Sequence, residues 1–150
     1  MVAPLNALDG RQALAVNLQF TRGRHGAAAR IELHERPAGR VAMLALLGWV
    51  DLTAERRIEQ ALDDLAARGA TQLVLDLSQL RHVDYRMVPR LVQAIARFEA
   101  RAGSVALCGM SRYLHDLFRL SGCDVRLHTW SSVAAVLAPA GPETSSERAS

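Results

Sequence analysis

The chain contains no lysine, because all 18 of its basic residues are arginine. A Walker phosphate-binding loop, a Schiff-base lysine and the phosphoacceptor-site lysine of a receiver domain are therefore excluded. Aromatic residues make up only 5% of the chain, so a core has to be filled by Leu, Val, Ile and Ala. No apolar run approaches the roughly 20 residues that a membrane span needs. The N-terminus has no basic segment followed by an apolar stretch, so we expect no secretion signal.

Cysteine is also scarce. Cys108 and Cys123 are too few for a disulfide framework, and we expect two reduced thiols in a cytoplasmic protein. The five histidines lack the spacing of a metal site, and we expect neither a metal nor a cofactor. The net charge of +3 is carried mainly by residues 1–30. The rest of the chain is nearly neutral, which gives little indication of nucleic-acid binding.

The composition divides the 150 residues into three parts. Residues 1–30 include a Gly- and Arg-rich stretch and are predicted to be a flexible or loosely packed extension, although residues 13–20 could form a strand or a helical turn. Residues 31–137 hold the periodic segments and are enough for one core. Residues 138–150 are rich in Pro and Ser, and we expect a disordered tail there.

Strand and helix patterns alternate within residues 31–137. Two apolar segments joined by Pro37-Ala38-Gly39 predict an antiparallel hairpin that ends at Gly48. An amphipathic helix follows, with Thr53 as its expected N-cap and Gly69 after its C-terminus. Further strands and helices are expected in alternation at 72–77, 86–101, 104–109, 111–122 and 125–130, with a short last helix from Ser131 or Ser132. The pattern predicts an α/β domain with a mixed, mostly parallel sheet of about five strands and about four helices.

The turn after the central strand carries the most specific motif. Leu73-Val74-Leu75-Asp76-Leu77-Ser78 reads as a buried strand, and Val83-Asp84-Tyr85-Arg86-Met87 opens an amphipathic helix. This combination resembles the STAS domain, the fold of bacterial anti-sigma-factor antagonists. The resemblance extends to Gly48-Trp49-Val50-Asp51 after the second strand and to Gly109-Met110-Ser111 before the third helix.

The resemblance implies a protein that acts by binding and is not an enzyme. Family members use the surface around this turn to dock onto an anti-sigma factor that is also a serine kinase. Phosphorylation of a turn hydroxyl breaks that complex, which is the partner switch that regulates transcription. The partner contacts that the resemblance implies here are Asp84, Tyr85, Arg86, Met87 and Arg90.

The turn departs from the family pattern Asp-Ser-(Ser/Thr)-Gly. Tyr85 and Arg86 stand at the hydroxyl positions and Met87 at the glycine, and a kinase site shaped for a small hydroxyl should not accept Tyr85. The domain is then a constitutive binder, or is switched at another hydroxyl, or is phosphorylated on Tyr85 itself. The other hydroxyls are Ser78, Thr53 and Ser111, for which turn or cap chemistry is the plainer role. Asp84 also has a plain role as a helix cap.

The second predicted helix carries a stripe of arginines, Arg86, Arg90, Arg97 and Arg101, within one sector of the helix at about 100° per residue. Glu99 lies too far round the helix to neutralise them. The stripe is either a solvated face or a docking face for an acidic partner, with phosphate or anionic lipid as the remaining alternatives. Nucleic acid is disfavoured, because no aromatic residue interleaves with the arginines.

Three functions follow from the sequence. The first is an anti-sigma-factor antagonist that sequesters an anti-sigma factor or a related kinase-like protein. The second is a STAS-like accessory subunit of an ABC-type transport or lipid-trafficking complex, bound to its ATPase subunit. The third is a small nucleotide-binding or hydrolytic domain, against which the missing lysine and Gly-rich loop argue. Asp76 and Asp84 are unaccompanied by a nucleophile or metal ligands, which argues against a catalytic pair. A homodimer is left open.

Overall fold

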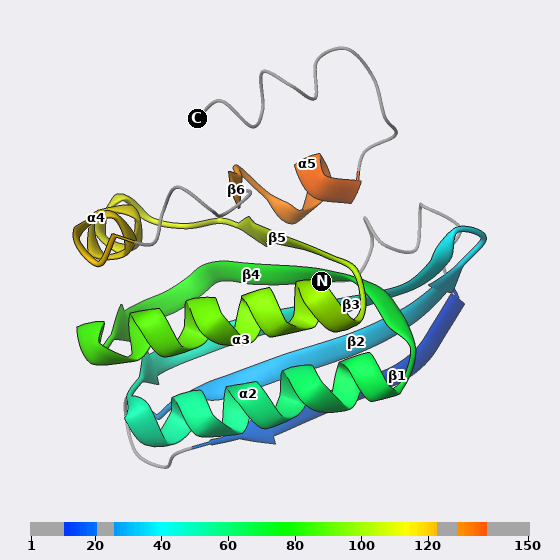
Figure 1. Cartoon of the computed structure of the whole chain (residues 1–150), viewed down its shortest axis with the longest axis horizontal. Coiled ribbons are helices and arrows are strands. Elements are labelled where there is room, and N and C mark those ends of the chain that lie inside the picture. Colours follow the sequence, from blue (N-terminus) through cyan, green and yellow to red (C-terminus); the bar gives the residue numbers. More distant parts are fainter. Residues whose placement is uncertain (1–10, 21–25, 123–128, 138–150) are drawn as a thin grey trace.

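The computed structural model describes residues 11–20, 26–122 and 129–137, and within these residues six strands form one mixed sheet (Figure 1). The strands lie side by side in chain order. They are β1 (Arg11–Gln19), β2 (Ala28–Arg36), β3 (Gly39–Val50), β4 (Ala70–Val83), β5 (Ser104–Cys108) and β6 (Thr129–Trp130). The pairs β1–β2 and β2–β3 are antiparallel, whereas the pairs β3–β4, β4–β5 and β5–β6 are parallel. This confirms the predicted α/β fold with a mixed sheet.

Two long helices, α2 (Leu52–Ala67) and α3 (Val88–Arg101), lie together on one face of the sheet (Figure 1). The 3₁₀ turn η1 (Tyr85–Met87) leads into α3, and α4 (Arg112–Leu120) follows β5. The short α5 (Val133–Leu137) packs on the other face, against Val41, Val74 and Cys108. Crossovers through α2 and α3 explain why β3, β4 and β5 are parallel.

The main core fills the space between the sheet and the two long helices. Leu44, Leu75 and Leu77 project from the strands, and Ile58, Leu62, Leu91 and Ile95 meet them from the helices. On α2 the buried side chains recur at i, i+4 and i+7, which is the spacing that predicted this helix. The aliphatic core that the composition required is therefore present.

Three local boundaries differ from those expected. Asp51, and not Thr53, caps α2, because its Oδ1 accepts from the N–H of Ala54 at 2.9 Å. Gly48 does not end β3, which continues to Val50. Its φ is +84°, and a Cβ there would collide with the carbonyl oxygen of Gly26, so the glycine allows a close approach inside the strand. β4 runs on to Val83 and carries the end of the sheet close to the turn.

The expectation of a loosely packed N-terminal extension does not hold for residues 11–20 and 26–30. β1 pairs with β2 from Arg11↔Glu35 to Gln19↔Ala28, and Phe20 and Ala27 are buried in the main core. The alternating Leu14, Val16 and Leu18 are the strand signal within this polar segment. Residues 1–10 and the expected tail 138–150 lie outside the described residues, as does Cys123.

Candidate functional site

The turn at Asp84 is fixed to the end of the sheet by its own backbone. The N–H of Asp84 donates to the carbonyl oxygen of Val50 at 2.9 Å, which joins the turn to the last residue of β3. The Asp84 carboxylate accepts from the backbone N–H of Arg86 at 3.0 Å and so caps η1. The capping role expected for Asp84 is therefore present, and the turn is a rigid extension of the sheet.

Asp84 and Arg86 form a two-pronged ion pair across the turn. Nη2 of Arg86 donates to Oδ2 at 2.6 Å, and Nε donates to Oδ1 at 3.0 Å. Hydrogen bonds from the Arg86 side chain, and then from its backbone, lower the pKa of Asp84 to about 2. The carboxylate is therefore ionised at neutral pH, and the turn offers a paired acid and base to its surroundings.

The side chains next to this pair point in opposite directions. Tyr85 is 66% exposed and projects from the surface, whereas Met87 is fully buried in the main core. Met87 therefore supports the turn from below and is not a surface contact in this structure. The glycine of the family pattern is replaced here by a side chain that adds to the core.

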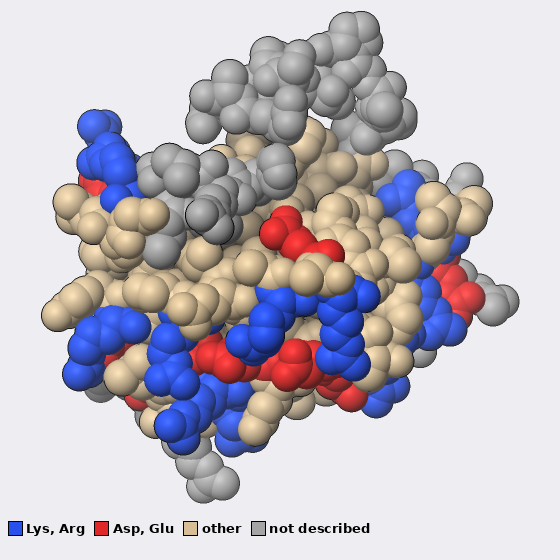
Figure 2. All heavy atoms as spheres, viewed as in Figure 1, with Lys and Arg blue, Asp and Glu red and all other residues tan. Residues whose placement is uncertain are grey.

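The arginine stripe is not an uncompensated basic face. Nε of Arg90 lies 3.3 Å from Glu55 and 3.8 Å from Glu59, and Nη2 of Arg97 lies 3.3 Å from Glu59. Both acids belong to α2, and Figure 2 shows acidic and basic side chains interleaved over this face. Glu99, the acid on α3 itself, takes no part in these ion pairs. Within the described residues, Arg101 has no ion-pair partner, so only the C-terminal end of the stripe is an open positive charge.

Glu55 is the unusual member of this group, because its side chain is fully buried. Neither of its carboxylate oxygens accepts a well-aligned hydrogen bond within the described residues, although Nε of Arg90 lies 3.3 Å from Oε1. Burial, followed by its hydrogen bond to Glu59 and the charge of Glu59, raises the pKa of Glu55 to about 8. When Glu55 is protonated, its hydroxyl donates a hydrogen bond to the carboxylate of Glu59. This bond lowers the pKa of Glu59.

The most distinctive surface lies around Tyr85. Within the described residues, the exposed large hydrophobic side chains are Trp49 (45% exposed), Tyr85 (66%), Tyr113 (42%) and Leu120 (80%). They come from the end of β3, from η1 and from α4. A cavity of about 570 Å³ is lined by Trp49, Tyr85 and Tyr113 together, and a second cavity of about 360 Å³ joins Tyr85 to Leu120. We call these four side chains the aromatic surface.

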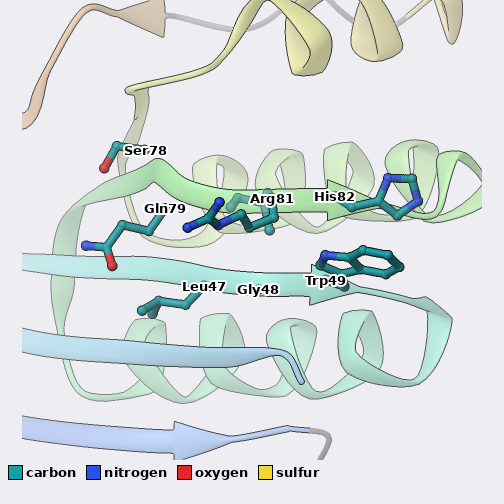
Figure 3. Close-up of a pocket in the computed structure, with 8 residues that line it drawn as sticks. Leu47, Gly48, Trp49, Ser78, Gln79, Arg81 and His82 are labelled. Carbon is teal, nitrogen blue, oxygen red and sulfur yellow. The ribbon is translucent and has the colours of Figure 1, made fainter. Parts of the chain in front are cut away.

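His82 holds two members of the aromatic surface in place. Its Nδ1 lies 2.6 Å from Oη of Tyr113, and the two rings stack with centroids 5.8 Å apart. The ring centroid of Trp49 lies 5.1 Å from that of His82, with the two ring planes tilted by 55°. Figure 3 shows Trp49 and His82 next to each other at the ends of β3 and β4. Trp49, His82 and Tyr113, which are far apart in the sequence, thus form one group of ring contacts only in the folded protein.

A larger open cavity of about 1060 Å³ lies next to these residues, and Trp49 and His82 line it (Figure 3). Arg81 and Gln79 of β4 line it, with Ser78 at the far end. The hydroxyl of Ser78 donates to Oδ1 of Asp76 at 2.7 Å, and its N–H donates to the same oxygen at 3.0 Å. Ser78 is therefore an exposed residue within β4 whose hydroxyl is engaged in a local hydrogen bond.

Sequence reasoning placed the turn correctly but missed most of the surface beside it. Ser111 is the N-cap of α4, as expected, with its Oγ accepting from the N–H of Leu114 at 3.2 Å. Tyr113 and Leu120 are not singled out by the sequence, and Trp49 appears there only within the motif Gly48-Trp49-Val50-Asp51. The available signal was the placement of Trp49 directly after a glycine at a strand end, and of Tyr113 in the first turn of a helix. Neither position reveals that the two side chains share one neighbour.

Within the described residues no group of three His, Cys, Asp or Glu side chains could hold a metal ion. The helices of this part of the chain are all too short or too polar to cross a membrane. The buried thiol of Cys108 has a pKa raised to about 12, first by burial and then by the charge of Asp76. A thiol with so high a pKa is a poor nucleophile at neutral pH.

Comparison with protein families gives a match over residues 33–129, to the family model described as "Mlab, STAS domain". The comparison with curated protein sequences yields no match. The matched residues extend from β2 to the first residue of β6, and they include the Asp84 turn and the whole aromatic surface.

Solved structures share this fold. An anti-sigma factor antagonist from Mycobacterium paratuberculosis superposes with a TM-score of 0.60 at 16% identity, over 78% of this chain and 96% of that one. The anti-sigma factor antagonist SpoIIAA in its unphosphorylated form gives a TM-score of 0.53 at 21% identity, over 79% and 95%. The murine anion transporter Slc26a9 gives a TM-score of 0.56 at 19% identity, over 65% of this chain and 17% of the transporter.

Proposed function

Because the chain belongs to the STAS domain family, we propose that it is a protein-binding module of the anti-sigma-factor-antagonist type, whose partner docks on the aromatic surface around the Asp84 turn. The observation that carries this proposal is the clustering of Trp49, Tyr85, Tyr113 and Leu120 at one end of the sheet. Exposed large apolar side chains are usually scattered singly, and a contiguous group marks an interaction site. Tyr and Trp are also the residues that most often dominate binding energy at interfaces.

The geometry favours a rigid binding surface over an adaptable one. The contacts of His82 with Trp49 and Tyr113 hold these two aromatic rings before any partner arrives. The backbone hydrogen bond from Asp84 to Val50 fixes the turn that presents Tyr85. Preordered side chains lose little conformational entropy on binding. We expect a partner with an apolar ridge that enters the cavity between Trp49 and Tyr85, flanked by polar groups that match the Asp84–Arg86 pair.

We propose that this binder is constitutive. The residues at the turn's hydroxyl positions are an exposed tyrosine and an arginine already paired with Asp84. The hydroxyl groups of Ser78 and Ser111 are already engaged in local hydrogen bonds. A phosphate on Tyr85 would stand within the proposed interface next to Asp84 and would weaken binding by desolvation and repulsion, so that switch is the alternative to test.

The anti-sigma factor or kinase-like protein is the first candidate partner. The second candidate is the ATPase subunit of a transport complex, and the specific observation in its favour is that a domain of the Slc26a9 anion transporter shares this fold. Both candidates use the same surface in this proposal. They differ in the protein that is captured, and neither requires this chain to be an enzyme.

The test is affinity capture from the native cell extract with the full chain as bait, followed by titration of the captured protein. Tyr85→Ala and Tyr113→Ala should each weaken binding by about tenfold or more, since central aromatic contacts often contribute over 1 kcal/mol. Arg101→Ala is the matched control, because it alters an exposed side chain at the far end of α3. We expect the control to bind like the parent protein.

The result separates the candidates. Capture of an anti-sigma factor or kinase-like protein supports the first, and capture of a transport ATPase supports the second. If Tyr85→Ala and Tyr113→Ala keep full affinity, the aromatic surface is not the interface. Measurable nucleotide hydrolysis by the purified chain would contradict the proposal that it acts by binding and is not an enzyme.

A further inference from the structure

Strand β1 forms one edge of the sheet, and β2 is its only partner strand within the described residues (Figure 1). The N–H of Phe20 donates to the carbonyl oxygen of Ala27 at 2.9 Å, in the same register as Gln19↔Ala28. Antiparallel pairs alternate between hydrogen-bonded and non-hydrogen-bonded residues. Leu18 and Val16 therefore bond to β2, while the backbone groups of Ala15 and Asn17 point away from the sheet.

This edge has none of the features that usually block strand pairing. Exposed edges are normally protected by charged side chains, by proline or by a bulge within the strand. Residues 14–19 contain no charge and no proline, and the bulge lies before them, between Gln12 and Leu14. The edge from Leu14 to Leu18 is regular and offers a template for another strand.

A second observation concerns the side chains of β1. Leu14, Val16 and Leu18 face the helix side of the sheet but are only half-buried. The helix α2 packs on β3 and β4, further into the sheet, so it does not fully cover this apolar row. One more strand beside β1 would bury the row. On this edge, the outward backbone groups of Ala15 and Asn17 therefore face no strand within the described residues, and the apolar side chains of β1 are only half-buried.

We propose that β1 pairs antiparallel with β1 of a second copy of this chain, about a two-fold axis at Val16, to form a continuous twelve-stranded sheet. Ala15 of one copy then stands opposite Asn17 of the other, and these are the residues whose backbone groups point outwards. On the helix side, Val16 meets Val16 and Leu14 meets Leu18. The apolar rows of the two copies join into one.

The arrangement of charges on the other face differs between this register and the neighbouring ones. On the other face of the sheet, Glu32 lies beside Ala15 and Arg30 beside Asn17. Pairing centred on Val16 puts Glu32 of one copy in the same cross-strand row as Arg30 of the other. Centring on Ala15 would align Glu32 with Glu32, and centring on Asn17 would align Arg30 with Arg30. The charges in each row stand three strand spacings apart, about 14 Å, so they favour the register at Val16 only weakly and mainly at low ionic strength.

The dimer is independent of the proposed partner surface, because β1 is the edge strand whereas the aromatic surface lies at the end of β3, on η1 and on α4. The test is sedimentation velocity of the full chain over a range of concentrations. We expect a monomer–dimer equilibrium. A monomer at every concentration up to the millimolar range would overturn the proposal.

Two variants address the edge itself. Asn17→Pro removes an outward-pointing N–H and leaves the bonds to β2 intact, which is the place where an edge strand accepts proline. Ala15→Lys adds the charge that natural edges carry. Each should weaken dimerisation at least tenfold, while Gln12→Lys, which adds the same charge outside the paired stretch, should not. Circular dichroism confirms folding, and a folded Ala15→Lys variant that dimerises normally would refute the interface.

The register has its own test. Non-hydrogen-bonded residues opposite each other are about 4.5 Å apart at Cα, within the range for a disulfide. In a Cys123→Ser background, with Cys108 buried, Val16→Cys should give a disulfide-linked dimer on mild oxidation. Leu18→Cys, on the same side of the strand, should not link to itself. Efficient linking at position 18 and none at 16 would overturn the register.

Discussion

Oε1 of the buried Glu55 lies 3.3 Å from Nε of Arg90, and this contact joins the first turn of α2 to the first turn of α3. The turn that presents Tyr85 lies immediately before α3, so the contact fixes the base of the proposed binding surface. Arg90 also reaches Glu59, which shares its charge with Arg97. The four side chains form one network between the two helices, and the protonation of Glu55 is part of it.

This network predicts how stability depends on pH. The pKa of Glu55 is raised from 4.5 to about 8 in the folded protein, first by burial. The folded state therefore holds this proton more tightly than the unfolded chain. The contribution is most favourable below pH 4.5 and declines as pH rises towards 8, at a slope of up to about 1.4 kcal/mol per pH unit.

Glu55→Gln should remove that decline, because glutamine resembles the protonated acid. Urea unfolding of both proteins between pH 5 and pH 9 measures the difference. We expect similar stabilities at pH 5 and a more stable variant at pH 9. Glu59→Gln is the control, since the pKa of Glu59 is lowered and its charge serves Arg97 and Arg90. If the difference in unfolding free energy between the parent protein and Glu55→Gln did not change with pH, this account would be contradicted.

Asp84→Ala should destabilise the turn. The substitution removes the cap of η1 and the two-pronged pair with Arg86, and loss of a cap costs about 1 kcal/mol. The pKa of Asp84 is lowered from 3.8 to about 2, so its contribution is present above pH 3.8 and is lost as pH falls towards 2. Acid unfolding of the parent protein and the variant should therefore converge near pH 2. Equal stability at pH 7 would show that the pair contributes nothing.

Gly48→Ala and Gly122→Ala form a matched pair. Both glycines have a positive φ, +84° and +72°, which costs an L-residue roughly 1–2 kcal/mol. A Cβ at Gly48 also collides with the carbonyl oxygen of Gly26, whereas a Cβ at Gly122 meets nothing within 4 Å. Thermal unfolding should show the larger loss for Gly48→Ala. Equal losses would mean that the approach of Gly26 is readily relieved.

Tyr113→Phe tests the stack with His82. The variant keeps the ring and loses the hydroxyl that lies 2.6 Å from Nδ1 of His82. A single hydrogen bond of this kind contributes roughly 0.5–1.5 kcal/mol, and less where both groups are exposed. We expect a small loss of stability and a clear change in the fluorescence of Trp49, whose neighbour His82 becomes freer to move. The Tyr113→Ala variant proposed for the binding test should change the fluorescence further.

Periodicity within the chain was sufficient to find the α/β architecture and the Asp84 turn. Helix α2 follows from Ile58, Leu62 and Leu65, and the strand before the turn from its alternating leucines. The edge strand β1 was weaker, because its three apolar residues alternate inside a segment whose composition favours a linker. The cap of α2 was misplaced from Asp51 to Thr53, since both side chains can accept a hydrogen bond and only the backbone angles choose between them.

Apolar spacing is local information, so α2, α3, β4 and β5 could be predicted from the chain alone. The sequence also determined that Asp84 opens a helix, since capping needs only neighbouring N–H groups. Only the packing of the elements brings Glu59, on α2, to Arg90 and Arg97 of α3, and brings His82 into contact with both Trp49 and Tyr113. These contacts join residues more than 30 positions apart. Their pairing depends on how the crossovers place one element beside another, which no local pattern encodes.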